Sequence, residues 1–377
     1  MGAIVRLKLS ILIAKLAAGL SKKILRRSGE TIAGRVLLAL YPKAISELAK
    51  GKKIICVSGT NGKTSTTKAL VSIISKLGPV ATSPSGSNLA RGVAAALMSR
   101  SEFAVLEVDE LHLSRVIDEA KPKAVLLLNL TRDQLHRMHE VKRVADRWAK
   151  SAQGAPETIF VGDIDDPFVA LALSSAAQSE KISFGGRKHQ DGAVCPSCGK
   201  YLKWLRNNYK CSCGLTNSNP DQSFESGSAA FRNATMANVV GKLFGAKPIA
   251  IDEKSLERSV DQVHKGVRTN IRLTKNPASW NEALKSVTGE NVILIVNSRE
   301  VDGIDTSWLW DISFAGLSAK HVVVCGERAL DIAYRLHVQG ITAEITTSFS
   351  DAVSKFDSGN DVHVLAAYTA FHELVNS

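Results

Sequence analysis

The decisive stretch reads Ser58-Gly59-Thr60-Asn61-Gly62-Lys63-Thr64-Ser65-Thr66. It follows a short apolar run, KIICV, that is typical of a buried strand, and a helical pattern begins within it. Glycines between a strand and a helix let backbone N–H groups crowd around a phosphate, and the helix N-terminus adds a favourable partial charge. In such a loop Lys63 reaches the β- and γ-phosphates of a nucleotide, and the Thr64 hydroxyl suits Mg²⁺. We therefore predict an ATP site on residues 59–65.

Apolar runs alternate with helical patterns downstream of this loop. Further strand candidates are Phe103–Val108, Lys123–Leu128 and Thr158–Val161. This β-α-β rhythm predicts a parallel sheet with helices on both faces. A polar stretch from residue 185 to residue 227 interrupts the rhythm and indicates an insertion outside the sheet. Helical patterns resume at Phe231–Gly245 and Asp252–Val263.

A second, smaller α/β pattern follows residues 264–269. Its strand candidates are Val292–Val296, Val322–Val324, Thr342–Ile345 and His363–Leu365. We therefore expect three parts along the 377 residues. They are an N-terminal amphipathic helical segment over residues 1–40, an ATPase domain over 41–265 with an insertion at about 186–226, and a C-terminal α/β domain over 266–377.

Four of the six cysteines cluster in the insertion as Cys195-Pro-Ser-Cys198 and Cys211-Ser-Cys213, with twelve residues between the pairs. With no recognisable signal peptide, two such pairs favour a tetrahedral Zn²⁺ site over disulfides, and they favour a cytoplasmic location. A closed four-thiolate site has no open position for catalysis, so we interpret it as a structural clip. The alternative is a nucleic-acid-binding ribbon, since aromatic and basic residues lie between the pairs: Tyr201, Trp204, Arg206, Tyr209 and Lys210.

The first 27 residues combine an apolar helical repeat with positive charge. The repeat consists of Ile4, Leu7, Ile11, Leu12, Leu16 and Leu20. Arg6, Lys8 and Lys15 interrupt it, so no uncharged stretch is long enough to cross a bilayer. Such a helix can lie on anionic lipid as a peripheral membrane contact or pack on the domain, and both interpretations stay open. The net charge of +12 favours acidic partners: nucleotides, phosphorylated substrates, anionic membranes or nucleic acid.

The phosphate loop resembles that of a known family. The general pattern has a glycine where this chain has Val57, but GTNGKT is similar to the ATP loop of the Mur ligase superfamily, which includes the folylpolyglutamate synthases. The resemblance implies that Glu107, in FAVLEVDE, holds Mg²⁺ together with Thr64, with Asp109 and Glu110 as nearby alternatives. It also implies that Asn233 of FRNATMAN contacts the nucleotide.

Three segments narrow the resemblance to MurT-like chains of this superfamily. They are NLTRDQLHR at 129–137, the four-cysteine insertion, and DGIDTSWLWD at 302–311, which is similar to the DGxDxSWxWD signature of those chains. The resemblance implies an α/β fold with a Mur ligase-type parallel-sheet ATPase domain that carries a zinc-ribbon insertion. It further implies a smaller, Rossmann-like α/β domain at the C-terminus.

The reaction expected of a phosphate loop with Mg²⁺ and an acidic acceptor is carboxylate activation through an acyl phosphate, with Lys63 neutralising phosphate charge. The resemblance implies that ammonia then converts the α-carboxyl of D-glutamate in lipid II to D-isoglutamine. The ammonia would come from a GatD-type glutaminase subunit, and an aspartate of this chain would serve that subunit. Asp305 is favoured for this role, with Asp311 second, because Asp302 precedes a glycine and suits a turn.

Other interpretations remain. Cys325 ends an apolar run, but Val323 stands where glutaminases of this class have glycine, so a buried strand cysteine is favoured over a nucleophile. One alternative function is a conventional Mur or folylpolyglutamate-type ligase, which adds an amino acid without a partner. A second is a zinc-ribbon ATPase that binds nucleic acid, which the sequence disfavours.

Overall fold

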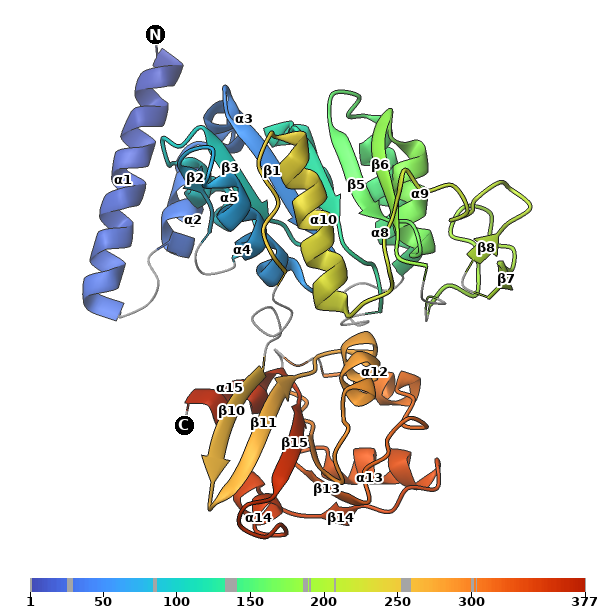
Figure 1. Cartoon of the computed structure of the whole chain (residues 1–377). Helices are drawn as coiled ribbons and strands as arrows, with labels where there is room; N and C mark the ends of the chain where they lie inside the picture. Colours follow the sequence, from blue (N-terminus) through green and yellow to red (C-terminus); the bar gives the residue numbers. More distant parts are fainter. Residues whose placement is uncertain are drawn as a thin grey trace. The chain divides into compact units, whose positions relative to one another are not determined.

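The computed structural model describes residues 2–25, 30–83, 87–132, 141–185, 189, 191–206, 208–251, 259–299, 302 and 304–376. The chain divides into two compact units, one over residues 1–131 and 141–253 and the other over 132–140 and 254–377. Each unit has its own β-sheet (Figure 1). No helix among the described residues is long and apolar enough to cross a bilayer.

The first unit contains a seven-stranded sheet with the order β2-β3-β1-β4-β5-β6-β9, in which every pairing is parallel. The strands are β1 (Lys53–Ser58), β2 (Val80–Ala81), β3 (Phe103–Glu107), β4 (Ala124–Leu127), β5 (Ile159–Asp163), β6 (Gln178–Ser183) and β9 (Gln222–Ser223). Strands β1, β3 and β4 are almost continuously apolar and buried, as a sheet covered on both faces requires. The predicted α/β fold with a parallel sheet is confirmed.

Helices link and cover these strands. They are α1 (Gly2–Leu25), α2 (Glu30–Leu40), α3 (Ala44–Ala49), α4 (Lys63–Ile74), α5 (Ala90–Leu97), α6 (Leu113–Ala120), α8 (Val141–Gln153), α9 (Pro167–Ser175) and α10 (Ala229–Leu243). One core cluster joins α4 and α10 to the centre of the sheet, where Leu70 and Val240 pack among Val57, Leu126 and Val161. This packing brings the N-terminal end of α10 to the same edge as the loop before α4 (Figure 1).

Between β6 and α10 lies the cysteine-containing insertion. Its own sheet has only two antiparallel strands, β7 (Lys203–Leu205) and β8 (Asn208–Lys210). The expectation that the whole of residues 186–226 stays outside the main sheet is wrong, because β9 pairs with β6. The chain is guided back to this edge by Asp221, whose carboxylate accepts the Lys181 N–H at 2.7 Å.

The second unit has a six-stranded sheet with the order β10-β11-β15-β12-β13-β14. Its strands are β10 (Ser259–His264), β11 (Val267–Leu273), β12 (Asn291–Ile295), β13 (His321–Cys325), β14 (Glu344–Ile345) and β15 (Asp361–Ala366). Its helices are α12 (Pro277–Lys285), the 3₁₀ helix η1 (Ser307–Asp311), α13 (Ala329–His337), α14 (Phe349–Val353) and α15 (Tyr368–Asn376). All pairings are parallel except β10 with β11. Buried clusters lie on both faces, one around Trp280 and Phe314 and one around Ile271 and Val364.

The second unit begins earlier than the sequence boundary at residue 266. Strand β10 pairs along its whole length with β11 through a tight turn at Lys265-Gly266, where both residues have positive φ. The predicted helix Asp252–Val263 is therefore wrong over residues 259–263, and residues 252–258 lie outside the described part. The error arose because β10, with the sequence SVDQVH, lies at a sheet edge and carries little apolar signal.

Candidate functional site

The loop between β1 and α4 is held in place by the segment that follows β4. The Thr60 N–H donates to the Asn129 carbonyl at 2.8 Å, and the Asn61 N–H donates to the Asn129 side-chain oxygen at 2.9 Å. The Asn129 amide donates back to the Asn61 carbonyl at 2.9 Å. Gly59 and Gly62 have φ of +141° and +84°, which side chains rarely tolerate. The loop is thus preformed by backbone geometry and by one asparagine.

Helix α10 contributes Asn233 to the loop. A Cβ atom at Gly62 would lie only 2.0 Å from the Asn233 side-chain nitrogen, so the two residues are in immediate contact. Asn233 is almost fully buried. Two residues that the sequence assigned to nucleotide binding, 171 positions apart (233 − 62), therefore lie side by side.

Lys63 opens α4 and its side chain is nearly buried. Its Nζ atom donates to Glu110 at 2.9 Å and also to the Gly59 and Thr60 carbonyls. Glu107, at the end of β3, is buried and lies opposite Val57 in the β1 register. Thr64 and Ser65 follow on the first turn of α4 and are half-buried.

The acidic residues after β3 have different surroundings. Asp109 accepts the Leu111 N–H at 3.0 Å and so shapes its own turn. Glu110 is buried at 5% exposure, and its carbonyl accepts the Trp148 indole N–H at 3.0 Å. A lysine, a hydroxyl and buried carboxylates around a helix N-terminus form a donor set that fits a nucleotide phosphate and a hard cation.

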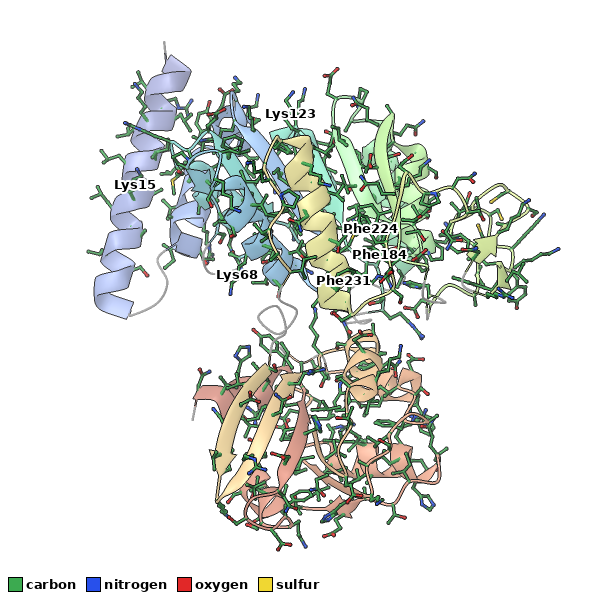
Figure 2. The ribbon with its side chains drawn as sticks, in the orientation of Figure 1. Lys15, Lys68, Lys123, Phe184, Phe224 and Phe231 are labelled. Carbon is green, nitrogen blue, oxygen red and sulfur yellow. The ribbon has the colours of Figure 1, made fainter. Side chains whose placement is uncertain are left out.

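A second buried polar cluster lies where β5 ends, and the sequence did not single it out. Arg232, next to Asn233, pairs with Asp163 and lies 3.6 Å from Asp165. Burial raises the pKa of Asp163 to about 6, and Arg232 opposes that rise. The guanidinium also lies over the Phe184 ring. Phe184 in turn stacks on Phe224, and both are labelled in Figure 2. The only signal in the sequence was the run Asp-Ile-Asp-Asp directly after a strand.

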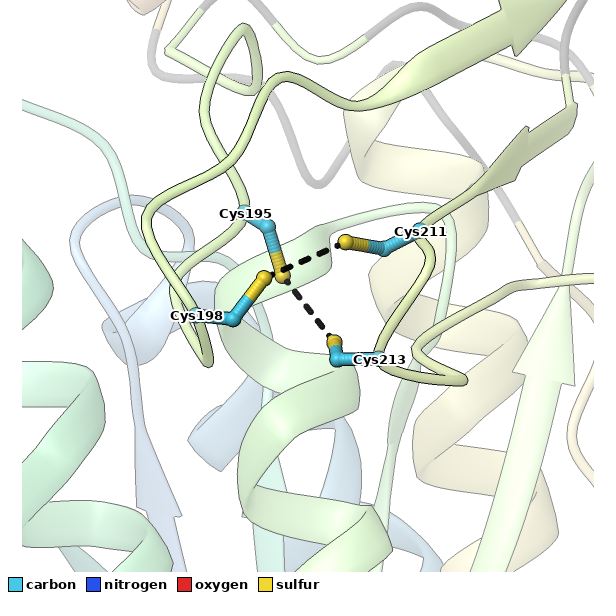
Figure 3. Close-up of side chains that lie close together, drawn as sticks. All are labelled: Cys195, Cys198, Cys211 and Cys213. Carbon is cyan, nitrogen blue, oxygen red and sulfur yellow. Dashed lines mark hydrogen bonds between the residues drawn. The ribbon is translucent and has the colours of Figure 1, made fainter.

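The four clustered cysteines meet at one point (Figure 3). The Cys195 and Cys213 sulfurs are 3.7 Å apart, those of Cys198 and Cys211 are 3.4 Å apart, and all four lie within 4.8 Å of one another. Tetrahedral Zn²⁺ with bonds of about 2.3 Å needs sulfurs about 3.8 Å apart, so the donor set fits zinc. Burial raises the pKa of Cys195 to about 12, whereas the Cys213 backbone N–H lowers that of Cys211 to about 6.

The insertion is fastened to the end of β5 by buried bonds. The Tyr209 hydroxyl donates to the Ile164 carbonyl at 2.9 Å, and the Asn217 amide donates to Asp165 at 3.0 Å. Trp204 packs on Tyr209 at 5.0 Å between ring centroids. Two aromatic residues of the insertion are thus used in its own packing, while Tyr201 is 82% exposed.

In the second unit the described residues of the DGIDTSWLWD stretch include both buried and exposed side chains. Asp302 is buried and accepts both the N–H and the hydroxyl of Thr369, so it joins this stretch to the first turn of α15. Asp305 is exposed and accepts the Ser307 N–H at 2.8 Å where η1 begins. Asp311 ends η1 and is half-buried.

Cys325 is buried, which raises its pKa to about 12, so the thiol lacks the properties of a nucleophile.

Comparison with known proteins matches both units. Residues 57–213 match the Mur ligase middle domain and residues 273–371 match the MurT ligase C-terminal domain. The chain is 27% identical to the lipid II isoglutaminyl synthase (glutamine-hydrolyzing) subunit MurT of Streptococcus pneumoniae, over 93% of each chain. It is 26% identical to the MurT subunit of Staphylococcus aureus strain N315, over 89% of each.

Solved structures agree on the fold. A pseudomurein peptide ligase type C from Methanothermus fervidus has a TM-score of 0.62 at 18% identity, covering 86% of this chain and 78% of that one. The MurF ligase of Thermotoga maritima in complex with ADP has a TM-score of 0.62 at 16% identity, covering 91% and 83%. At these identities the likeness concerns the fold alone.

Proposed function

Because the chain is an ATP-dependent ligase, a MurT-like member of the Mur ligase superfamily, we propose that it amidates the α-carboxyl of D-glutamate in lipid II. The product is D-isoglutamine. The observation that carries the proposal is the presence on one chain of a preformed phosphate loop, in contact with Asn233, and a MurT-type C-terminal domain.

ATP binding is assigned to the loop amides of residues 59–62, to Lys63, Thr64 and Ser65, and to Asn233 on the nucleotide side. For Lys63 to reach the β- and γ-phosphates it must exchange its hydrogen bonds to Glu110 and the loop carbonyls for phosphate oxygens. The positive charge of the buried lysine therefore has an anionic partner both without nucleotide, where it is Glu110, and with nucleotide, where it is phosphate. Thr64 and Glu107 would hold Mg²⁺, which when bound neutralises charge on the phosphates.

The chemistry proceeds in two balanced steps. An oxygen of the acceptor carboxylate attacks the γ-phosphorus, and the bond to the ADP oxygen breaks, leaving an acyl phosphate and ADP. Ammonia then attacks the acyl carbon, inorganic phosphate leaves, and the nitrogen loses a proton. The chain's own contribution is to position the phosphates and to neutralise charge through Lys63 and the loop N–H groups.

The nitrogen would come from a GatD-type glutaminase subunit in a heterodimer, because Cys325, the nucleophile considered from the sequence, is buried and has a raised pKa. We assign Asp305 as the residue that serves the partner, with Asp311 second. The exposed position of Asp305 supports its availability to a partner.

Zn²⁺ on Cys195, Cys198, Cys211 and Cys213 would act structurally, as a zinc ribbon. Four cysteines grouped as metal ligands and the need for ATP favour the cytoplasm, at the inner face of the membrane where lipid-linked precursors are reached.

The test uses the purified chain together with a purified GatD-type glutaminase. With lipid II, ATP, Mg²⁺ and glutamine, mass spectrometry should detect the amidated lipid, and free ammonia should replace glutamine when the partner is omitted. Addition of an amino acid by the chain alone would instead establish a conventional Mur or folylpolyglutamate-type ligase. Steeply salt-dependent binding to DNA or RNA would favour the nucleic-acid ATPase.

A further inference from the structure

Helix α1 has an outward face of large apolar side chains. Val5, Leu9, Leu12, Leu16 and Leu20 recur at steps of four, three, four and four residues, which places them along one side of a helix. Each is between 55% and 66% exposed. These five residues are called the α1 stripe below. Single exposed leucines are common on protein surfaces, but a continuous row of five is not.

The opposite face of α1 packs on the protein. Ser10, Ala14 and Ser21 are buried there, and α1 runs beside α2 at the edge of the first unit (Figure 1). The usual arrangement is therefore reversed, since the small residues face the domain and the large apolar residues face outward. Intramolecular packing accounts for the buried face of α1 and leaves the α1 stripe without a function.

Positive charge flanks the α1 stripe. Lys8 and Lys15 each precede a stripe leucine by one residue and so lie along one flank, while Arg6 follows Val5 on the other. All three side chains are exposed. The sequence of α1, GAIVRLKLSILIAKLAAGLSKKIL, has no acidic residue. An apolar stripe bordered by lysine and arginine matches the interface of an anionic bilayer, where acyl chains lie beneath negative headgroups.

A second copy of this chain fits the α1 stripe less well. Two such helices packed together would bring their basic flanks close, and neither helix has an acidic residue to pair with them. A span across the bilayer is also excluded, since no described helix is long and apolar enough.

We propose that α1 lies in the plane of an anionic membrane, with the α1 stripe inserted among the acyl chains and Arg6, Lys8 and Lys15 at the headgroups. Membrane binding by α1 would hold the ligase where a lipid-linked acceptor is found. The biological purpose of this binding therefore rests on the proposed function. The surface itself is independent of the ATP site.

The experiment is co-sedimentation of the 377-residue chain with vesicles of phosphatidylglycerol and phosphatidylcholine, and with vesicles of phosphatidylcholine alone. The wild-type chain should bind the anionic vesicles and bind the neutral ones several-fold more weakly. The double variant Leu12→Ser/Leu16→Ser should lose about tenfold or more in affinity for both. Lys8→Gln/Lys15→Gln should weaken binding to anionic vesicles only.

Leu330→Ser/Val338→Ser is the matched control, because these residues are similarly exposed, at 73% and 52%, but lie on α13 and at its C-terminal cap. It should bind vesicles like the wild type. Unchanged vesicle binding by the α1 variant, or no binding by the wild type, overturns the proposal. So does a wild-type dimer in sedimentation velocity that becomes monomeric in the α1 variant, since the α1 stripe would then join two copies. Vesicle binding is measured without substrates, so failure of the amidation assay leaves this result standing, and the reverse also holds.

Discussion

The contact between Gly62 and Asn233 makes Gly62→Ala the most informative change in the ATP site. The new Cβ would lie 2.0 Å from the Asn233 side-chain nitrogen, and the backbone φ of +84° is unfavourable for alanine. A left-handed conformation costs about 1–2 kcal/mol for a residue with a side chain. Forcing a buried neighbour aside adds about 1–3 kcal/mol. We therefore expect Gly62→Ala to lose roughly 2–5 kcal/mol of unfolding free energy.

Gly245 provides the matched control. It has the same φ of +84°, but a Cβ there meets nothing within 4 Å. Gly245→Ala should therefore lose only the backbone term, about 1–2 kcal/mol, and should bind ADP normally. Gly62→Ala should bind ADP about tenfold or more weakly, because 1.4 kcal/mol of displaced contact already gives that factor.

The contact between Gly62 and Asn233 can be tested with a double-mutant cycle. Without nucleotide, Gly62→Ala should be less damaging in an Asn233→Ala background, since the clashing atoms are gone, and its effect should approach that of Gly245→Ala. Urea unfolding gives the free energies and calorimetric titration gives the ADP affinities. If Gly62→Ala and Gly245→Ala prove equally stable and bind ADP equally well, the contact that defines the site does not exist.

Lys63→Ala should abolish ATP hydrolysis and lose about 3–5 kcal/mol of stability, because it leaves Glu110 buried without its cation; adding Glu110→Gln should restore stability in urea unfolding but not hydrolysis. Elemental analysis should find one zinc per chain, and Cys213→Ser should lower the melting temperature more than it lowers ATP hydrolysis; metal-free protein as first purified would contradict this. Burial raises the pKa of Asp163 to about 6, so its contribution to stability is full below the unfolded pKa of about 4 and is lost as pH rises through about 6; Asp163→Asn should remove that loss when the two unfolding profiles are subtracted. Asp305→Asn should spare ATP hydrolysis and slow glutamine-dependent amidation, with free ammonia restoring the rate; normal glutamine hydrolysis would shift attention to Asp311.

Much of the first unit was predictable because its central strands carry their own signal. KIICV, FAVLE and AVLL are apolar on both faces, which only a covered parallel sheet requires. The strands that were missed lie toward the edges. Strand β6, with the sequence QSEKIS, is half-exposed over most of its length, and β2 and β9 have two residues each. Edge strands are defined by their neighbours rather than by their own composition.

The same distinction applies to the site. The loop over residues 58–66 is formed by residues that adjoin in sequence, so its position between a strand and a helix could be predicted. The pairing of Lys63 with Glu110 depends on the conformation of the turn after β3. The spacing of residues in the sequence does not predict that conformation. The pairing of Arg232 with Asp163 joins residues 69 positions apart. Such pairs follow from the packing of α10 on the sheet, which a single sequence does not display.

The insertion and the ATP site are connected through the end of β5. The insertion is small and buries few large side chains of its own, chiefly Leu202, Tyr209 and Leu215. A segment with so little core needs a covalent or metal staple to hold one conformation, and the four thiols supply the ligands for one. Two of its buried polar bonds, from Tyr209 and Asn217, go to Ile164 and Asp165 rather than to solvent.

Those bonds attach the insertion to the residues that follow β5. Asp165 accepts from the insertion and also lies beside Arg232, which immediately precedes Asn233 on α10. Asn233 in turn contacts Gly62 of the phosphate loop. The cysteine-containing insertion and the loop are therefore linked through Asp165, Arg232 and Asn233 within the first unit. A ribbon attached only for recruitment would not need buried bonds to the end of a central strand, and these bonds favour a supporting role for it within the ATPase unit.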